Sequence, residues 1–407
     1  NRISAPLAKM TVEDFVGYGA RPGDIKLVFE PKEKGYEDDY PEIMSNIFEY
    51  NEDGLNTTEL YEDALVYGRG AEAYWINPEI KISNTSLYMP EYKRVDCEDV
   101  VFIYTNEIKP QIEKAIRYYT YDEETYCEVY EIKKTTTYQR TKTDWKEIDK
   151  QETPFNYPAM IQYISNRDKE AIFEADKKLI DSHDNLISKS MNEIDRFNGM
   201  IMMLPQKVRK EIVDKLIEYK VIDDLEGIEA DKWPKYLNKD LGGIDSFSNA
   251  LADRIEKLYH KTSKDPDMSD DNFANNASGV AIAFKLIGFE FKASMIDSYF
   301  DKGIMRKIDM LNDAITAKNT SDITSVNADP YKYDVKIQHN RNMPIDIESK
   351  VRVAQLLTGI VSKETLLKWL PQDIVENAEK ELEKIKVERE SMPTLITLDD
   401  EGDNDAE

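Results

Sequence analysis

Apolar residues recur at helical spacing in three long stretches of this chain. In residues 167–198 they lie three or four positions apart, or at sums of those steps, which predicts a helix roughly 48 Å long with one narrow apolar stripe. Residues 246–261 repeat the pattern over a shorter length. Residues 200–243, between them, mix short strand-like pieces with a helical segment. The pattern therefore predicts two helices that enclose a compact insertion.

The third stretch, residues 278–317, is apolar on too many sides in its first turns to be a simple surface helix. It follows directly on a loop of acids and amides. The polar residues of that loop are Asp265, Asp267, Ser269, Asp270, Asp271, Asn272, Asn275 and Asn276. Such side chains are costly to bury and should face water or a polar partner. A buried helix with this loop at its end would hold the loop at one fixed place.

The first 65 residues mix helices with turns. The predicted segments are a short helix over 11–16, turns over 17–23, a strand over 25–29 and an amphipathic helix over 56–66. Asn56 or Thr57 would cap the last helix, because short polar side chains bond the first free amides of a helix. Its inward-facing residues would be Leu60, Ala64 and Leu65.

Residues 71–164 are rich in aromatic and β-branched residues with turn residues between them. About five or six strands are predicted, centred on 73–76, 100–104, 116–121, 127–132 and 135–138. The many tyrosines of this module have few basic neighbours, which favours sheet packing over a stacking platform for nucleic-acid bases.

The C-terminal part is predicted to be mostly helical. A strand over 333–337 precedes helices over 347–358 and 363–370 and a charged helix over 373–390. The last nine residues hold six acids, so residues 393–407 are expected to form a disordered acidic tail. The whole chain is therefore predicted to be α+β and mostly helical.

Composition narrows the classes of function. A net charge of −26 argues against an electrostatic nucleic-acid binder and against an acidic membrane surface as partner. No run of 18 apolar residues is free of charge and no signal peptide opens the chain, so we expect a soluble cytoplasmic protein. The chain opens at Asn1 rather than Met, which indicates a fragment or a processed chain. For Cys97 and Cys127 we expect free thiols, with a disulfide as the alternative.

No recognisable catalytic motif occurs in this sequence. It holds no phosphate-binding loop, dinucleotide fingerprint, zinc-protease motif or nucleophile elbow, and its histidines, His183, His260 and His339, lie far apart. The acidic loop has calcium-like alternate spacing from Asp265 onward. Its sixth position is Asp270 instead of glycine, and its twelfth is Asn276 instead of glutamate, so it fits a calcium loop poorly. No catalytic residue, metal or cofactor is predicted.

Residues 266–273, with 278–282 and 285–286, closely resemble the signature of portal proteins of long-tailed double-stranded DNA bacteriophages. Supporting similarity follows the same order along the chain, at 1–3, 8–12, 17–18, 68–74, 340–344, 359–367 and 370–371. The resemblance implies the portal fold, assembled as a ring, usually of twelve subunits. It implies a wing over 1–166, stem helices over 167–199 and 244–263, a clip over 200–243, a tunnel loop over 264–277, a wing helix and strand over 278–344, and a crown over 345–392.

The resemblance also implies a function that is not enzymatic. A portal ring is the channel at one capsid vertex through which DNA enters and leaves, without sequence readout. Its implied partners are terminase, a head-completion or tail adaptor protein, and the capsid and scaffolding proteins. The protein would be assembled in the host cytoplasm and reside in the virion. A negatively charged channel suits this role, because like charge prevents firm phosphate contacts.

Two sets of residues are candidates for the site. The tunnel-loop residues expected to line the DNA channel are Asp267, Ser269, Asp270, Asp271, Asn272 and Asn275. The clip residues expected to contact a partner are Lys207, Arg209 and Lys210. The alternatives are an ordinary solvated loop and a solvated helix face. For the whole protein, the alternatives are a hydrolase that uses the loop acids, with or without calcium, and a capsid-binding adaptor that forms no ring.

Overall fold

The computed structural model describes residues 2–82, 85, 87–198, 202–203, 235–236, 241–267, 279–317, 328–341, 352, 354–358, 361–369, 375 and 378–391. Contacts divide the chain into two units. The larger unit contains residues 1–269 and 286–342, and the smaller unit contains residues 270–285 and 343–407. The fold is α+β, as predicted.

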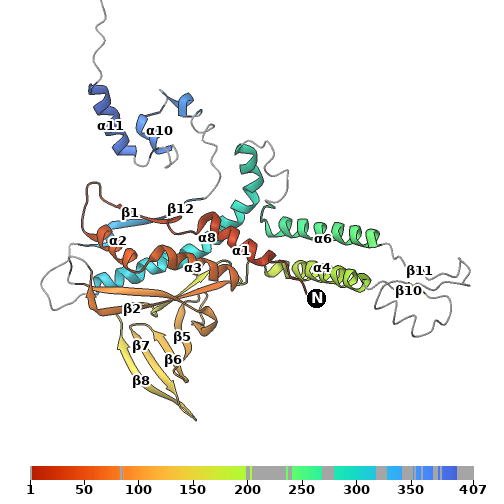
Figure 1. Ribbon diagram of the computed structural model, residues 1–407. Coiled ribbons are helices and arrows are strands. Elements are labelled where there is room, and N and C mark those ends of the chain that lie inside the picture. Colours follow the sequence, from red (N-terminus) through yellow and green to blue (C-terminus); the bar gives the residue numbers. More distant parts are fainter. Residues whose placement is uncertain are drawn as a thin grey trace, which may run out of the picture. The chain divides into compact units, whose positions relative to one another are not determined.

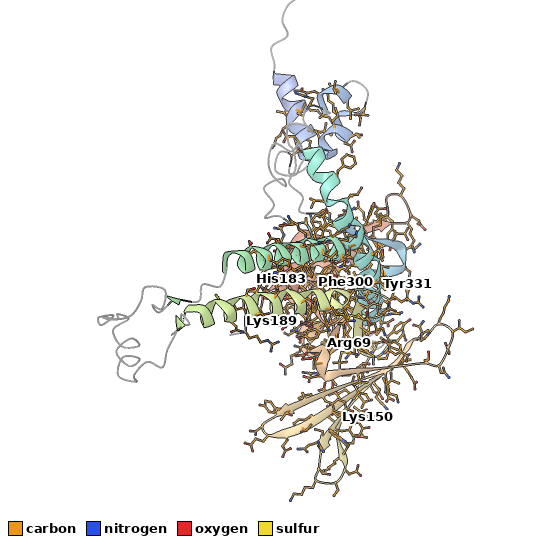
Figure 2. All side chains as sticks on the ribbon, turned by 90° about the vertical axis from the view of Figure 1, so that its right-hand side faces the viewer. Arg69, Lys150, His183, Lys189, Phe300 and Tyr331 are labelled. Carbon is orange, nitrogen blue, oxygen red and sulfur yellow. The ribbon has the colours of Figure 1, made fainter. Side chains whose placement is uncertain are left out.

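The larger unit is built in layers around α8 (Gly279–Thr316), whose residues from 286 onward belong to it. The other helices of this core are α1 (Leu7–Gly19), α2 (Tyr40–Tyr50) and α3 (Asp53–Val66). These helices lie between β2 and the antiparallel pair formed by β1 (Ile25–Pro31) and β12 (Tyr333–His339) (Figure 1). Phe300 of α8 is fully buried and lies among densely packed side chains in Figure 2.

Two antiparallel sheets replace the single β-rich module. The first has the order β3-β2-β9 and consists of β2 (Arg69–Lys81), β3 (Tyr88–Val95) and β9 (Met160–Ile164). The second is a meander of β4 (Val100–Tyr104), β5 (Ile112–Tyr121), β6 (Glu124–Glu131), β7 (Lys134–Arg140) and β8 (Trp145–Glu152). The described strands of this region thus outnumber the five or six predicted. The tyrosines pack as expected, since Tyr74, Tyr92 and Tyr163 are buried in the core.

Helices α4 (Lys177–Asn198) and α6 (Leu241–Ser263) pack against each other. Figures 1 and 2 both show them side by side, with β10 (Met202–Met203) and β11 (Lys235–Tyr236) beyond their ends. These two short strands pair antiparallel. The predicted arrangement of two helices flanking a segment between them is therefore present. The helix predicted over 206–219 lies outside the described residues.

The start of α4 was predicted wrongly. The helix begins at Lys177 rather than at residue 167, after a short 3₁₀ turn over Glu174–Asp176. Residues 167–173 instead form an irregular segment that lies against the core, where the amide of Ile172 donates to the carbonyl of Leu65 at 2.8 Å. Lys169 adopts a positive φ of 58°, which an α-helix cannot contain. The apolar residues at 172 and 173 therefore pack on the core and not along the helix.

Two predictions for the first 65 residues were also wrong, and one helix was missed. Helix α1 continues through Gly19 instead of turning at residue 17, because Tyr18 packs against Phe289 with ring centroids 4.8 Å apart. Asn56 and Thr57 lie inside α3, which begins at Asp53, so neither caps it. The sequence pattern did not separate α2 from the turns around it.

The described part of the smaller unit is helical. It includes the first turns of α8, α10 (Lys363–Trp369) and α11 (Ala378–Ser391). Helices α10 and α11 contact each other. The charged helix begins at residue 378 rather than 373, and of the helix predicted over 347–358 only residues 352 and 354–357 are described as helical. The predicted acidic tail lies outside the described residues.

Candidate functional site: the root of the acidic loop

Only the base of the predicted tunnel loop lies within the described residues. Asp267 is described, and it has interaction partners. The remaining loop candidates, Ser269, Asp270, Asp271, Asn272 and Asn275, lie outside the described residues, as do the clip candidates Lys207, Arg209 and Lys210. The structure therefore describes how the loop begins and which groups hold its first residues. We call residues 264–267 the loop root.

Asp265 fixes the loop root to α1 and α6. Helix α6 ends at Ser263, and Lys264 takes a left-handed φ of 65° that stops the helix. The next residue, Asp265, is only 3% exposed. Its Oδ2 atom accepts a hydrogen bond from Oγ1 of Thr11 at 2.7 Å, and its amide donates to Oγ of Ser263 at 3.3 Å. A buried carboxylate thus turns the chain out of the helix at a defined position.

Tyr259, one turn earlier in α6, strengthens the same junction. Its side chain is buried, and its hydroxyl lies 2.7 Å from Oγ1 of Thr11 and 3.1 Å from the carbonyl oxygen of Leu7. His260 contributes Nδ1 at 3.1 Å from the carbonyl oxygen of Asp265. The start of α1 and the end of α6 are therefore joined through side chains that are more than 240 residues apart in sequence.

Lys292 connects the loop root to α8. Its Nζ donates to the carbonyl oxygen of Ser263 at 2.9 Å and to that of Ile172 at 3.4 Å. Burial lowers the pKa of this amine. A cation at the last carbonyl of a helix is favourable, because the helix dipole is negative there. The end of α6 is thereby tied to the long helix that follows the loop.

Thr262 and Asp176 add a tie to the start of α4. Oγ1 of Thr262 donates to Oδ1 of Asp176 at 2.6 Å, and Asp176 is 4% exposed. The residues before α1 lie along α4 further on. The amide of Ala5 and the hydroxyl of Ser4 donate to Asp184 at 2.9 and 2.7 Å. The loop root is therefore the meeting point of α1, α4, α6 and α8.

Further along α8, three of its acids bind the last residue of β12 and the chain just after it. Arg341 pairs with Glu290 at 3.1 Å and also with Asp297. His339 lies 3.0 Å from Asp301 through Nε2. The hydroxyls of Tyr18 and Tyr61 donate to Glu290 and Asp297. Gly19 sits against Arg341 so closely that a Cβ there would overlap the guanidinium. This network fixes the middle of α8 against α1 and β12.

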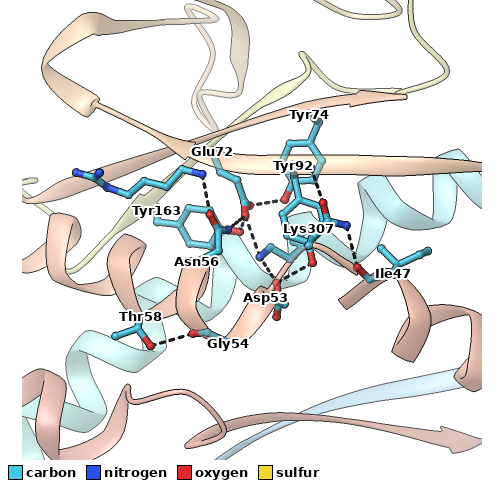
Figure 3. Close-up of polar contacts among 12 residues, drawn as sticks. Ile47, Asp53, Gly54, Asn56, Thr58, Glu72, Tyr74, Tyr92, Tyr163 and Lys307 are labelled. Atoms are coloured by element: carbon cyan, nitrogen blue, oxygen red, sulfur yellow. Dashed lines mark hydrogen bonds and ion pairs between the residues drawn. The ribbon is translucent and has the colours of Figure 1, made fainter. Parts of the chain in front are cut away.

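A buried ion pair fixes α8 to the sheet (Figure 3). Lys307 is 1% exposed, and its Nζ lies 2.7 Å from Oδ1 of Asp53 and 2.9 Å from Oε1 of Glu72. Burial alone would lower the pKa of Lys307, but the two carboxylates outweigh it and raise the pKa. Glu72 is fully buried and also accepts hydrogen bonds from Tyr74, Tyr163 and, at 2.5 Å, Asn56. Asp53 in turn accepts a hydrogen bond from the hydroxyl of Tyr92 at 2.8 Å, so each of the two carboxylates that bind Lys307 has further partners.

The sequence analysis missed three groups of contacts that hold α8 in place, which we call its anchors. They are the Lys292 tie to α6, the Arg341 and His339 network, and the Lys307 ion pair. The sequence analysis described α8 as a largely apolar helix and assigned no role to its charged residues. The available signal is spacing. Residues 290, 297 and 301 share one face of the helix, and this face adjoins the buried residues Phe289, Ala293, Ile296, Phe300 and Ile304. Charges beside a buried apolar stripe must find partners, since an unpaired buried charge is costly.

No reactive centre is formed by the described residues. Among them no three His, Cys, Asp or Glu side chains are gathered so that they could hold a metal ion. Within the same residues, no helix is long and apolar enough to cross a membrane. Both cysteines are free and buried, and burial raises the pKa of each thiol, to about 11 for Cys97. The free thiols agree with the sequence prediction.

The chain was also compared with known proteins. A family model described as phage portal protein, SPP1 Gp6-like, matches residues 1–392. This chain belongs to that family. It is also similar to a protein named portal protein from Clostridium phage phiCD119, with 24% identity over 338 residues, or 75% of this chain and 69% of the relative. The resemblance seen in the sequence is thereby confirmed.

Membership of the portal family excludes the enzymatic alternative. Portal proteins are structural and not enzymatic, so the hydrolase alternative is wrong. The family implies a DNA channel, an oligomeric ring, DNA and capsid as partners, and a place at the vertex of the virion capsid. The roles of individual loop and clip residues do not follow from family membership.

Proposed function

We propose that this chain is the subunit of a twelve-membered portal ring and that its acidic loop lines the narrowest part of the DNA channel. The observation that carries this proposal is the loop root. A loop that sets the bore of a channel must keep a constant radius while DNA passes. Asp265, Tyr259 and Lys292 tie its first residues to α1, α6 and α8, which supports such a fixed base.

Charge supports the same role for the loop. Asp267, Ser269, Asp270, Asp271, Asn272 and Asn275 carry acids, amides and one hydroxyl, with no cation among them. Phosphate contacts that hold DNA firmly come from lysine and arginine. A collar of acids and amides would touch passing DNA without binding it, which suits movement in both directions during packaging and ejection.

Exposed apolar side chains support ring assembly. In the isolated subunit Phe291 and Met295 of α8 are 64% and 65% exposed, and Ile287 lies one turn before them at 46%. Phe247 of α6 is 69% exposed. Large apolar side chains that share a helix face in this way mark surfaces that another protein covers. In a ring, neighbouring copies of the same chain would cover them.

The remaining regions receive their roles from the same proposal. Helices α4 and α6 form the stem, residues 200–243 form the clip, and residues 345–392 form the crown. The wing consists of 1–166 together with 278–344. Lys207, Arg209 and Lys210 of the clip contact terminase during packaging and the head-completion or adaptor protein afterwards. The capsid and scaffolding proteins would meet the ring during assembly in the host cytoplasm.

Native mass measurement tests the ring directly. The expected species has about twelve times the subunit mass of 47.2 kDa. A stable monomer at high concentration would contradict the ring and favour the capsid-binding adaptor. As a second measurement, a chain lacking residues 267–275 should still assemble but should fail to package DNA. Unfolding of this deletion variant would show that the loop is structural instead.

A further inference from the structure

A buried carboxylate oxygen at the loop root accepts no hydrogen bond from a donor among the described residues. Asp265 is nearly fully buried, and although its Oδ2 atom accepts a hydrogen bond from Thr11, its Oδ1 atom is buried without any hydrogen bond among the described residues. Such an atom is costly, because it has lost water and gained nothing in return. Asp14 lies three residues after Thr11 on the same face of α1, and its carboxyl group is within hydrogen-bonding reach of Asp265.

We propose that Asp14 and Asp265 form a proton-dependent latch, in which protonated Asp14 donates to the buried Oδ1 atom of Asp265 and holds the loop root on α1. When Asp14 loses the proton, two carboxylates face each other and the hold weakens. The balance is simple. One proton leaves the Asp14 carboxyl group for solvent, and one O–H···O bond between the two side chains is lost.

The surroundings decide which acid carries the proton. The polar and titratable groups packed around the pair are Glu13 and Thr11 of α1, Tyr259, His260 and Ser263 of α6, Lys264 of the loop root, Asp176 before α4, and Lys292 of α8. Burial raises the pKa of Asp265, and the hydroxyl of Thr11, His260 and Lys292 oppose this by favouring its ionised form. Burial, Asp265 and Glu13 all disfavour the charge of Asp14, and only His260 opposes them. We therefore place the shared proton on Asp14, because Asp265 already accepts the hydrogen bond of Thr11 and has Lys292 and His260 beside it.

The direction of the pH effect follows from these positions. Burial and the neighbouring Asp265 raise the pKa of Asp14 from 3.8 to about 6. An acid whose pKa is raised in the folded protein contributes stability fully below its unfolded pKa and loses it as pH rises through the folded value. The latch is therefore closed below about pH 4 and opens as pH rises through about 6. The bonds made by Thr11, Tyr259 and Lys292 do not need this proton, so the loop root stays attached above pH 6 and loses only this one tie. The latch is independent of whether the loop lines a channel.

Hydrogen exchange of the full chain, followed by mass spectrometry and corrected for the intrinsic rate, tests the latch at pH 5 and pH 7.5. We expect the peptide that covers the end of α6 and the loop root to lose protection about tenfold at the higher pH, after allowance for the partial exposure of Asp14. In Asp14→Asn the side-chain amide donates at both pH values, so protection should stay high. In Asp14→Ala the donor is absent, so protection should stay low.

Two matched variants separate this latch from other causes. Glu13→Gln changes the neighbouring acid, which is 61% exposed, and should keep the wild-type response to pH. His260→Gln removes the imidazole beside Asp265 and should also keep it. The proposal is overturned if His260→Gln abolishes the response, if Asp14→Asn retains it, or if the wild-type chain shows none. Restoration of protection at pH 7.5 by added calcium would also overturn it, because a cation would then occupy the pair.

Discussion

Charged residues have opposite surroundings in the core around α8 and in β8, the last strand of the five-stranded sheet. Along α8, Lys307 and Asp297 are buried and Lys292 is partly buried, and each is held by partners from other elements. In β8, all eight residues are exposed, and its charges face water. Figure 2 shows Lys150 on this sheet, far from the packed interior around Phe300. The charged residues of α8 help to fix the position of that helix, whereas the charged residues of β8 only keep the strand in contact with water.

Forming a buried ion pair and breaking one have very different effects on stability. A buried ion pair contributes little net stability, because removing two charges from water offsets most of their attraction. Removing one partner is nevertheless costly, because the other remains buried and unpaired. An exposed charge has no such penalty. We therefore infer that the anchors of α8 act mainly by excluding other placements of the helix, and substitutions can test this.

The largest effect is expected at Lys307. Lys307→Met leaves Glu72 buried without its cation and should lower the free energy of unfolding by about 3–5 kcal/mol. The matched control is Lys150→Met in β8, where the change should stay within about 0.5 kcal/mol. Urea unfolding followed by circular dichroism measures both. Equal effects of the two substitutions would contradict the contrast between the core and the sheet.

Two glycines of α8 provide a smaller and more local comparison. At Gly303 an added Cβ would overlap the ring of Tyr163, whose Cε1 atom would lie 2.7 Å away. Gly303→Ala should therefore destabilise the protein by about 1–3 kcal/mol. At Gly288 the nearest atom, Cδ of Lys264, would lie at an ordinary 3.6 Å. Gly288→Ala should stabilise by up to about 1 kcal/mol, because alanine favours helix over glycine. Thermal unfolding of the two variants should shift in opposite directions, and a shared direction would refute the packing argument.

The smallest effect is expected at His339. Burial lowers its pKa, but the hydrogen bond with Asp301 and the charge of Asp297 outweigh this and raise the pKa above 6.5. A histidine with a raised pKa contributes stability fully below pH 6.5 and loses it as pH rises through the folded value. The free energy of unfolding should therefore fall by less than about 1 kcal/mol between pH 6 and pH 8.5. His339→Gln should remove this part of the pH dependence, and an unchanged slope would exclude His339 as its source.

How far the sequence predicted the fold depends on whether the deciding contacts are local. The long helices α6 and α8 and the pairing segment 333–337 were predicted within a few residues, because apolar periodicity is written into adjacent positions. The start of α4 was missed, since residues 172 and 173 are drawn onto a core formed elsewhere. Asn56 has the right chemistry for a cap, yet it lies inside α3 because its amide meets the buried Glu72. In both cases a distant partner overrode the local preference.

The candidate site shows the same limit. The loop and its acids were visible in the sequence, and so was the family. Asp265 was counted among the loop acids that should face water, but it is buried. Nothing in the spacing of residues near 265 reveals that Thr11 and Asp14 lie beside it, because these partners come from the other end of the chain. The acid pair and the lysine that ties α8 to α6 could be found only in the folded structure.

The sequence by itself therefore determined the type of most elements, the α+β class, the acid balance and membership of the portal family. These properties depend on periodicity, composition and short motifs, which neighbouring residues carry. Only the tertiary structure decided which charges are buried, which acids lie together at the loop root and where α4 begins. The physical reason is that burial and ion pairing are properties of contacts between segments more than 200 residues apart, such as those joining Asp53 to Lys307 and Thr11 to Asp265.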